Sequence, residues 1–200
     1  MTHLLFILIY WFHPSLDSVT LRYEFNDESR LFLKGNTNVT AFKCDCSDNY
    51  RSGKVSYASD PSTGKLTFFN TSIKIPSKSL DCRNRFINRD LCESLKADKY
   101  PEIEVKLLEA VPTHGSGALD KNGLYKYKAK ALIKIAGAAK PQTFEVILQK
   151  RGENQFRIFA TEDISMNEYD IVPKSPLKFI KIEDAISIHF ELNVSLESYH

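Results

Sequence analysis

The sequence predicts an all-β protein, an antiparallel barrel of about eight strands with one short helix. Three observations predict this fold. Long runs alternate apolar and polar residues, short turn signals separate the runs, and one segment at about residues 84–98 has helical apolar spacing instead. A sheet of that size with one apolar face must curl or stack to hide that face. Strands of about ten residues favour a barrel, which leaves no free edge, and a two-sheet sandwich is the alternative.

The strands are identified by their alternation. In chain order the alternating runs are RLFLKGNTNVTAF (30–42), KLTFFNTSIKI (65–75), IEVKLLE (103–109), LYKYKAKALIKI (124–135), FEVILQK (144–150), QFRIFATEDI (155–164) and ISIHFELNVSL (186–196). A phase slip near Phe69 predicts a bulge in the second run. Turn signals that contain Gly or Pro occur at residues 60–64, 114–117, 121–123, 140–141 and 151–152. Connections this short predict antiparallel neighbours.

The segment SLDCRNRFINRDLCESLKADKYPEI (79–103) breaks this alternation. Its apolar residues Ile87, Leu91 and Leu95 recur every four positions, which is the spacing of one helix face. Asn84 or Asn88 can cap the start of the helix, and Pro101 keeps the residue before it out of helical geometry. We expect a short amphipathic helix that lies across a barrel mouth or along its flank.

Four cysteines, Cys44, Cys46, Cys82 and Cys92, are predicted to form disulfides. A helix that contains both Cys82 and Cys92 holds their sulfurs too far apart to bond with each other. We therefore expect each member of the first pair to bond with a member of the second, which staples the helix to the first hairpin. Which member bonds with which is open, and free thiols or a metal site are the alternatives.

The first residues have the composition of a secretory leader. Residues 4–12 (LLFILIYWF) are all apolar, and this run is shorter than the roughly 20 residues that span a membrane. We expect a signal peptide over residues 1–18, cleaved between Ser15 and Ser18, and a β-barrel domain over residues 19–200. A buried first strand or helix is the alternative. A cleaved leader implies a periplasmic or secreted protein without a stable membrane span.

Charge and motifs argue against several classes of function. The formal net charge is +2 and no basic block is present, so nucleic acid is not an expected partner. The chain has no G-x-S-x-G, P-loop or H-E-x-x-H motif. His114 and His189 are expected at the surface. We expect no enzyme activity, no metal and no cofactor.

Three segments resemble the YceI-like family. They are SIKIPSKSLDCRNRFINRDLCESLKADKYPEIEVKL (72–107), KALIKIAGAAKPQTFEV (130–146) and MNEYDIVPKSPLKFIKIEDAISIHFEL (166–192). In the family a strand leads to a charged segment, a helix and a Tyr-Pro step. A strand with a small-residue turn and a closing strand follow. The cysteines point to a subgroup with paired cysteines. The resemblance implies an extended lipocalin-like barrel that is exported, binds long isoprenoid-type lipids in its interior and performs no catalysis.

The candidate ligand-binding residues are those on the inward apolar faces of the predicted strands. Lys126, Lys128, Lys130 and His189 are expected outside the barrel. The candidates are Ile103, Val105, Tyr125, Tyr127, Ile133, Ile135, Phe144, Val146, Ile188, Phe190 and Leu192.

Two other hypotheses are open. In one, the chain is an exported structural or interaction module whose barrel is filled by side chains and binds no ligand. In the other, it is a secreted glycoprotein, because it contains three formal glycosylation sequons, which begin at Asn38, Asn70 and Asn193.

Overall fold

The computed structural model describes residues 18–47, 52–115, 119–120, 123–174 and 179–198. One α-helix, α1 (Arg85–Ser94), and two short 3-10 helices, η1 (Ser77–Ser79) and η2 (Asn167–Tyr169), occur in these ranges. The remaining elements are the strands β1 (Ser18–Phe25), β2 (Arg30–Thr37), β3 (Ala41–Cys46), β4 (Gly53–Ser59), β5 (Leu66–Phe69), β6 (Ser72–Pro76), β7 (Leu80–Asp81), β8 (Glu102–Pro112), β9 (Leu124–Ile135), β10 (Ala138–Lys150), β11 (Gln155–Ser165) and β12 (Ile182–Ser198).

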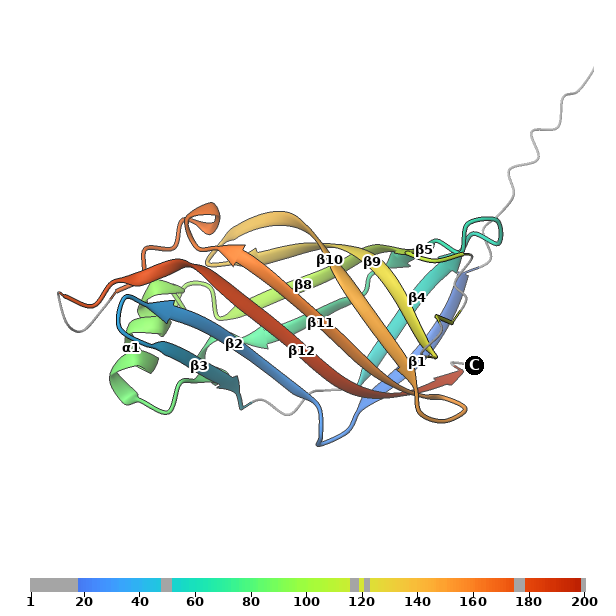
Figure 1. Ribbon diagram of the computed structural model, residues 1–200, viewed down its shortest axis with the longest axis horizontal. Helices are drawn as coiled ribbons and strands as arrows, with labels where there is room; N and C mark the ends of the chain where they lie inside the picture. Colours follow the sequence, from blue (N-terminus) through green and yellow to red (C-terminus); the bar gives the residue numbers. More distant parts are fainter. Residues whose placement is uncertain (1–17, 48–51, 116–118, 121–122, 175–178, 199–200) are drawn as a thin grey trace, which may run out of the picture.

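The strands close into an antiparallel barrel (Figure 1). Its ring has the order β1-β4-β5-β8-β9-β10-β11-β12, and β12 pairs back with β1 from Leu21↔Ser198 to Phe25↔Val194. The predicted barrel of about eight strands is therefore confirmed. A ring that closes on itself rules out the sandwich, because a sandwich would leave its two sheets unpaired at their edges.

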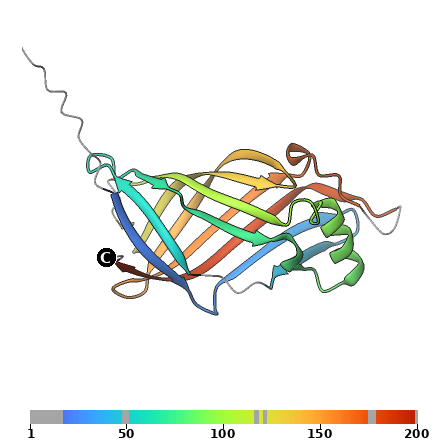
Figure 2. The same cartoon turned by 180° about the vertical axis from the view of Figure 1, so that it is seen from behind.

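The barrel is extended at one end by the four other strands. The first half of β12 pairs with β2, β2 pairs with β3, β3 pairs with β7, and β6 pairs with β8. Helix α1 follows β7 at this same end, as Figures 1 and 2 show from opposite sides. This end is therefore built from short strands and a helix, whereas the other end is a closed ring.

Side chains fill the middle of the barrel. Ala129 and Ala131 on β9 are fully buried, opposite Phe144 and Gln142 on β10. Leu31 and Phe190, which are paired across β2 and β12, belong to the same core cluster. Small residues on β9 thus make room for large neighbours, and the interior at this level is packed.

The outer face carries charges of both signs in register. On β9, Lys128 lies opposite Glu145 of β10, and Lys130 and Lys134 lie opposite Glu109 and Glu104 of β8. Each of these lysines therefore has a glutamate directly across the ladder, and this lysine face forms no basic patch.

The β9–β10 turn differs from the prediction. Lys140 and Pro141 were expected to form a turn, but both lie within β10. The turn is formed by Ala136 and Gly137, both with positive φ, at 51° and 91°. Pro141 pairs with Leu132 of β9, and the pairing of β10 with β11 starts only at Val146. A proline without an N–H is tolerated there because this part of β10 has no partner on its β11 side.

The run 30–42 is a hairpin and not the single strand that its alternation predicted. β2 ends at Thr37 and β3 begins at Ala41. Across the turn, the hydroxyl group of Thr37 donates a hydrogen bond to the backbone carbonyl of Thr40 at 2.8 Å.

The predicted bulge near Phe69 is a break between β5 and β6, with Asn70 at φ 51°. Strands β1 and β4 had not been assigned from the sequence.

Candidate functional site

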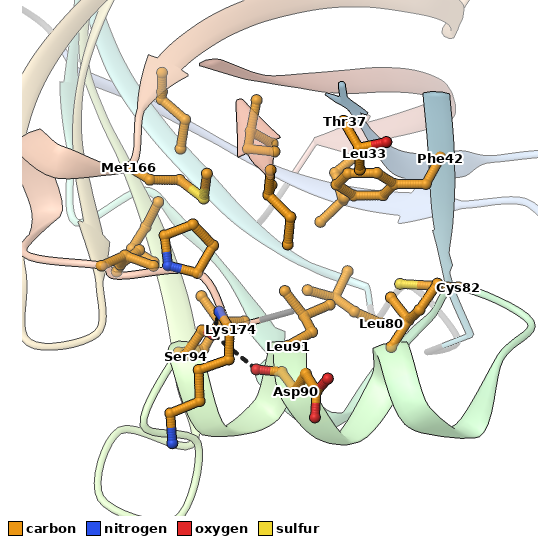
Figure 3. Close-up of a pocket in the computed structure, with 18 of the residues that line it drawn as sticks. Leu33, Thr37, Phe42, Leu80, Cys82, Asp90, Leu91, Ser94, Met166 and Lys174 are labelled. Carbon is orange, nitrogen blue, oxygen red and sulfur yellow. Dashed lines mark hydrogen bonds between the residues drawn. The ribbon is translucent and has the colours of Figure 1, made fainter. Parts of the chain in front are cut away.

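An apolar pocket of about 200 Å³ lies at the extended end of the barrel, between α1 and the strands (Figure 3). Nearly all of the surface that lines it is carbon. The lining residues are Leu33, Thr37, Val39, Thr40, Phe42, Leu80, Cys82, Ile87, Asp90, Leu91, Ser94, Leu95, Ile103, Ile135, Ile164, Met166, Ile171, Pro173, Lys174, Ile180, Ile182, Ile186 and Ile188.

Helix α1 forms one wall of the pocket. The side chain of Asn84 caps the helix by accepting from the backbone N–H groups of Phe86 at 2.9 Å and Ile87 at 3.3 Å. The stripe Ile87, Leu91 and Leu95 faces the pocket, as its spacing predicted. The helix is shorter than the expected range 84–98, because it ends at Ser94 and Lys96 adopts a left-handed φ of 52°.

The β2–β3 hairpin forms the opposite wall. Phe42 and Leu33 point toward the centre of the pocket from these strands, facing Leu91 on α1 (Figure 3). Gly35 makes this arrangement possible. A Cβ atom there would lie 2.4 Å from Cζ of Phe42 and 2.6 Å from Cδ1 of Ile186. Any side chain at position 35 would therefore displace two lining residues.

One disulfide holds the two walls together. Cys44 on β3 is bonded to Cys82, which precedes α1 and lines the pocket. The predicted link between the first hairpin and the helix segment is present. The expectation that all four cysteines pair is not met, because Cys46 and Cys92 are free thiols in the structure. Sγ of Cys46 instead lies 3.1 Å from the hydroxyl of Ser79.

A polar contact closes one corner of the pocket. The backbone N–H of Lys174 donates to Oγ of Ser94 at 3.3 Å, as the dashed line in Figure 3 shows. The Lys174 ammonium lies 2.9 Å from Oε2 of Glu93, and this hydrogen bond and charge lower the pKa of Glu93 below its usual value. The segment that carries Ile171 and Pro173 is thereby attached to the last turn of α1.

The candidate residues divide between this pocket and the filled barrel. Ile103, Ile135 and Ile188 line the pocket. The others share the inner face but lie outside the lining, namely Val105, Tyr125, Tyr127, Ile133, Phe144, Val146, Phe190 and Leu192. Alternation identifies which side chains point inward, but not the level at which the interior is empty.

Sequence reasoning did not find several residues of the pocket. Ile164, Met166 and Ile171 come from the end of β11 and the η2 segment, which has no regular alternation. Leu33 and Phe42 belong to a run that was assigned as one strand. The sequence YDIVP, apolar but not periodic, was the available signal for the η2 segment.

A polar group of residues lies inside the barrel where β10 and β11 separate. η2 contacts both strands, and the fully buried Tyr169 accepts a hydrogen bond from Nε2 of Gln142 at 3.3 Å. Glu162, opposite the buried Ile188, is on the inner face of β11. Burial, and secondarily the charge of Asp163, raises the pKa of Glu162.

No histidine is among the described residues that line the pocket. His189 is on the outer face, stacked on Phe32 with ring centroids 4.6 Å apart, and burial lowers its pKa. Within the described ranges, no three His, Cys, Asp or Glu side chains come together in a way that could hold a metal ion. As far as those ranges extend, no helix has the length and apolarity that crossing a membrane requires.

Comparison with known proteins assigns the chain to a family. A family model described as "YceI-like domain" matches residues 19–194. The matched range contains the whole lining of the pocket and all of the described ring strands except the first residue of β1 and the last four residues of β12. None of the curated proteins matches the chain.

Solved structures share the fold at low sequence identity. Burkholderia cenocepacia BcnA has a TM-score of 0.61 and 14% identity, over 86% of this chain and 99% of that one. A polyisoprenoid binding domain from Saccharophagus degradans, implicated in plant cell wall breakdown, has a TM-score of 0.62 and 11% identity, over 90% and 99%. A Campylobacter jejuni YCEI protein has a TM-score of 0.53 and 16% identity, over 82% and 85%.

Proposed function

Because this chain belongs to the YceI-like domain family, we propose that it binds the apolar end of a long, isoprenoid-type lipid without catalysing a reaction. The observation that carries the proposal is the pocket beneath α1, whose lining is almost entirely apolar. The polyisoprenoid-binding description of one structural neighbour supports the ligand class. An apolar chain needs little directional chemistry, since each buried methylene contributes about 0.8 kcal/mol.

The size of the pocket limits how much of the lipid it can hold. A volume of about 200 Å³ is below the range of about 300–1,000 Å³ that is typical of ligand pockets, so the pocket holds only part of a long lipid chain. The remainder of a long chain would lie at the edge of the pocket, because the barrel around Ala131 is already filled.

We also propose that the protein works outside the cytoplasm, in the periplasm or as a secreted protein. The disulfide between Cys44 and Cys82 supports this location, because such bonds persist in oxidising compartments. The apolar run 4–12, which resembles the core of a secretory leader, supports it too, although it lies outside the described residues.

The test is lipid retention by protein that is purified without detergent. Organic extraction followed by mass spectrometry should recover an apolar lipid from the wild type. Leu91→Trp fills the pocket from the α1 wall and should abolish retention. Phe86→Trp on the same helix is the control, because Phe86 is 47% exposed and does not line the pocket. Wild-type retention by folded Leu91→Trp would refute the proposal.

A filled structural or interaction module is the second candidate. The packed level of Ala129, Ala131 and Phe144 favours it, since the interior has no space for a ligand at that level. The same extraction separates the two functions. A module would yield no lipid from the wild type, even after incubation with an isoprenoid alcohol, and Leu91→Trp would change nothing but stability.

A further inference from the structure

The three most exposed large apolar side chains of the described residues lie at one place, the edge of the pocket. They are Val172, which is 76% exposed, Phe179, which is 68% exposed, and Val39, which is 61% exposed. Val39 itself lines the pocket, and the other two are neighbours in sequence of the lining residues Pro173 and Ile180. We call Val39, Val172 and Phe179 the rim. Exposed apolar side chains that gather around a pocket indicate an interaction surface.

Hydrogen bonds of Asn38 hold part of the rim together. Nδ2 of Asn38 donates to the carbonyl of Phe179 at 3.0 Å, and its Oδ1 accepts from the backbone N–H of Lys181 at 2.8 Å. The backbone N–H of Asn38 donates to the carbonyl of Lys181 at 3.0 Å. The β2–β3 turn and the residues before β12 are therefore side by side, at the end that carries α1 (Figure 1).

The charge of the rim segments differs from that of the barrel wall. Residues 37–40, 171–174 and 179–182 contain two lysines, Lys174 and Lys181, and no acidic residue. Lys174 contacts Glu93 on α1, whereas Lys181 is exposed beside the rim. On the barrel wall, by contrast, lysines of β9 face glutamates across the ladder. Apolar side chains with adjacent lysines complement a lipid surface that carries anionic headgroups.

We propose that this end of the barrel docks on an anionic phospholipid bilayer through Val39, Val172 and Phe179. Their side chains enter the boundary between headgroups and acyl chains, and Lys181 contacts phosphate. The pocket then opens onto the bilayer, so that an apolar chain passes between membrane and protein without crossing water. This inference rests on the proposed lipid binding, because it assigns the surface through which the same pocket is loaded.

Flotation with vesicles tests the docking. The probe is a vesicle of equal parts phosphatidylcholine and phosphatidylglycerol, and the protein is the full mature chain. The double variant Val172→Ser/Phe179→Ser should bind these vesicles at least about ten-fold more weakly than the wild type, because two inserted side chains are lost. Lys181→Gln should weaken binding to anionic vesicles and leave binding to pure phosphatidylcholine unchanged.

The matched control is Val111→Ser/Leu119→Ser. These residues are 39% and 52% exposed. Val111 is one of the last two residues of β8, Leu119 lies between β8 and β9, and Figure 1 shows β8 ending away from α1. This double variant should bind as the wild type does. The docking surface would be wrong if the wild type did not float with the vesicles, or if the rim and control variants behaved alike. It would also be wrong if the rim variant abolished only a self-association seen by sedimentation, which would assign the rim to a second copy.

Lipid loading separates this proposal from the function on which it rests. When an isoprenoid alcohol is delivered from ethanol, without vesicles, the rim variant should load as the wild type does. Leu91→Trp should load nothing and still float with the vesicles. Loading without flotation in the wild type would refute the docking alone, and flotation without loading would refute the proposed ligand site alone.

Discussion

Cys44 and Cys82 lie directly opposite each other. The pairs Asp45↔Asp81 and Cys46↔Leu80 set the register of β3 and β7, and the next pair in this antiparallel register is Cys44 with Cys82. Their bond joins residues that are 38 apart in sequence. Only two residue pairs form the β3–β7 ladder. The bond therefore provides a covalent connection at a short ladder, at the point where the chain leaves β7 to form the pocket wall α1.

Removing this bond should lower stability markedly. In the chain-entropy model a closed loop of 38 residues is worth about 4 kcal/mol. Cys44→Ser/Cys82→Ser should lose a free energy of unfolding of about this size in urea titration. Cys46→Ser and Cys92→Ser, which replace the free thiols, should each cost less than about 1 kcal/mol. Non-reducing peptide maps of the wild type that link Cys46 or Cys92 to another cysteine would contradict the pairing.

A side chain at Gly137 should lower the stability of the protein. It has φ 91°, and a Cβ atom there would lie 2.5 Å from Cζ of Tyr100. We expect Gly137→Ala to destabilise by about 2–3 kcal/mol, measured by urea titration. Gly123→Ala is the control, because Gly123 has φ 74° but no atom within 4 Å of its would-be Cβ. It isolates the backbone cost of about 1 kcal/mol. Equal losses would show that Tyr100 does not determine the cost.

Glu162 should make stability depend on pH. Burial and the charge of Asp163 raise the pKa of Glu162 in the folded state above its value in the unfolded state, which is near 4.5. The contribution of Glu162 to stability is therefore complete below the unfolded-state pKa. It is lost as the pH rises through the folded-state pKa. Glu162→Gln should therefore gain stability relative to the wild type at neutral pH and lose that gain when the wild-type carboxyl is protonated. Urea titrations on both sides of the folded pKa measure this, with the exposed Glu145→Gln as control. A gain that does not vary with pH would show that ionisation is not its cause.

Leu91→Ala should enlarge the pocket. Removing the half-buried side chain from the α1 wall should cost about 1–2 kcal/mol of stability. It should also shift the preference toward lipids with bulkier ends, measured by mass spectrometry after competition between isoprenoid alcohols of different branching. Leu132→Ala is the control, because it makes the same substitution on the outer face of the barrel, where Leu132 of β9 lies opposite Lys106 of β8. An unchanged preference in Leu91→Ala would indicate that this wall does not contact the ligand.

Regular alternation predicted the barrel because each long strand buries one face along its whole length. In β12 the residues from Ile186 to Val194 alternate between buried and half-exposed without a break. The four-residue spacing of Ile87, Leu91 and Leu95 likewise predicted both the helix and the face that it buries.

The pattern failed where alternation continues through a turn. Leu31, Leu33 and Gly35 continue into Thr37 and Val39 without a change of period, although the chain reverses at Asn38. Pro141 was misinterpreted for a different reason. Its place in β10 depends on β11 separating from β10, which is a relationship between distant residues.

The position of the pocket could not be predicted from local pattern, although some of its lining residues were. Leu33, Leu91 and Met166 meet there from three parts of the chain, and each is an ordinary apolar residue in its own segment. Tyr125 and Tyr127, which the pattern favoured, point inward at another level of the barrel. The position of an empty space depends on the volumes of all the side chains that could fill it.

The pairing of β12 also determines when the molecule can form. This strand of 17 residues pairs with β1, β2 and β11, and it is the last of the described strands. During synthesis the ribosome releases it after every strand that it joins. Until then β1, β2 and β11 all have unpaired edges, which can bond to other chains. A nascent chain of this protein thus cannot close the described ring before β12 has emerged.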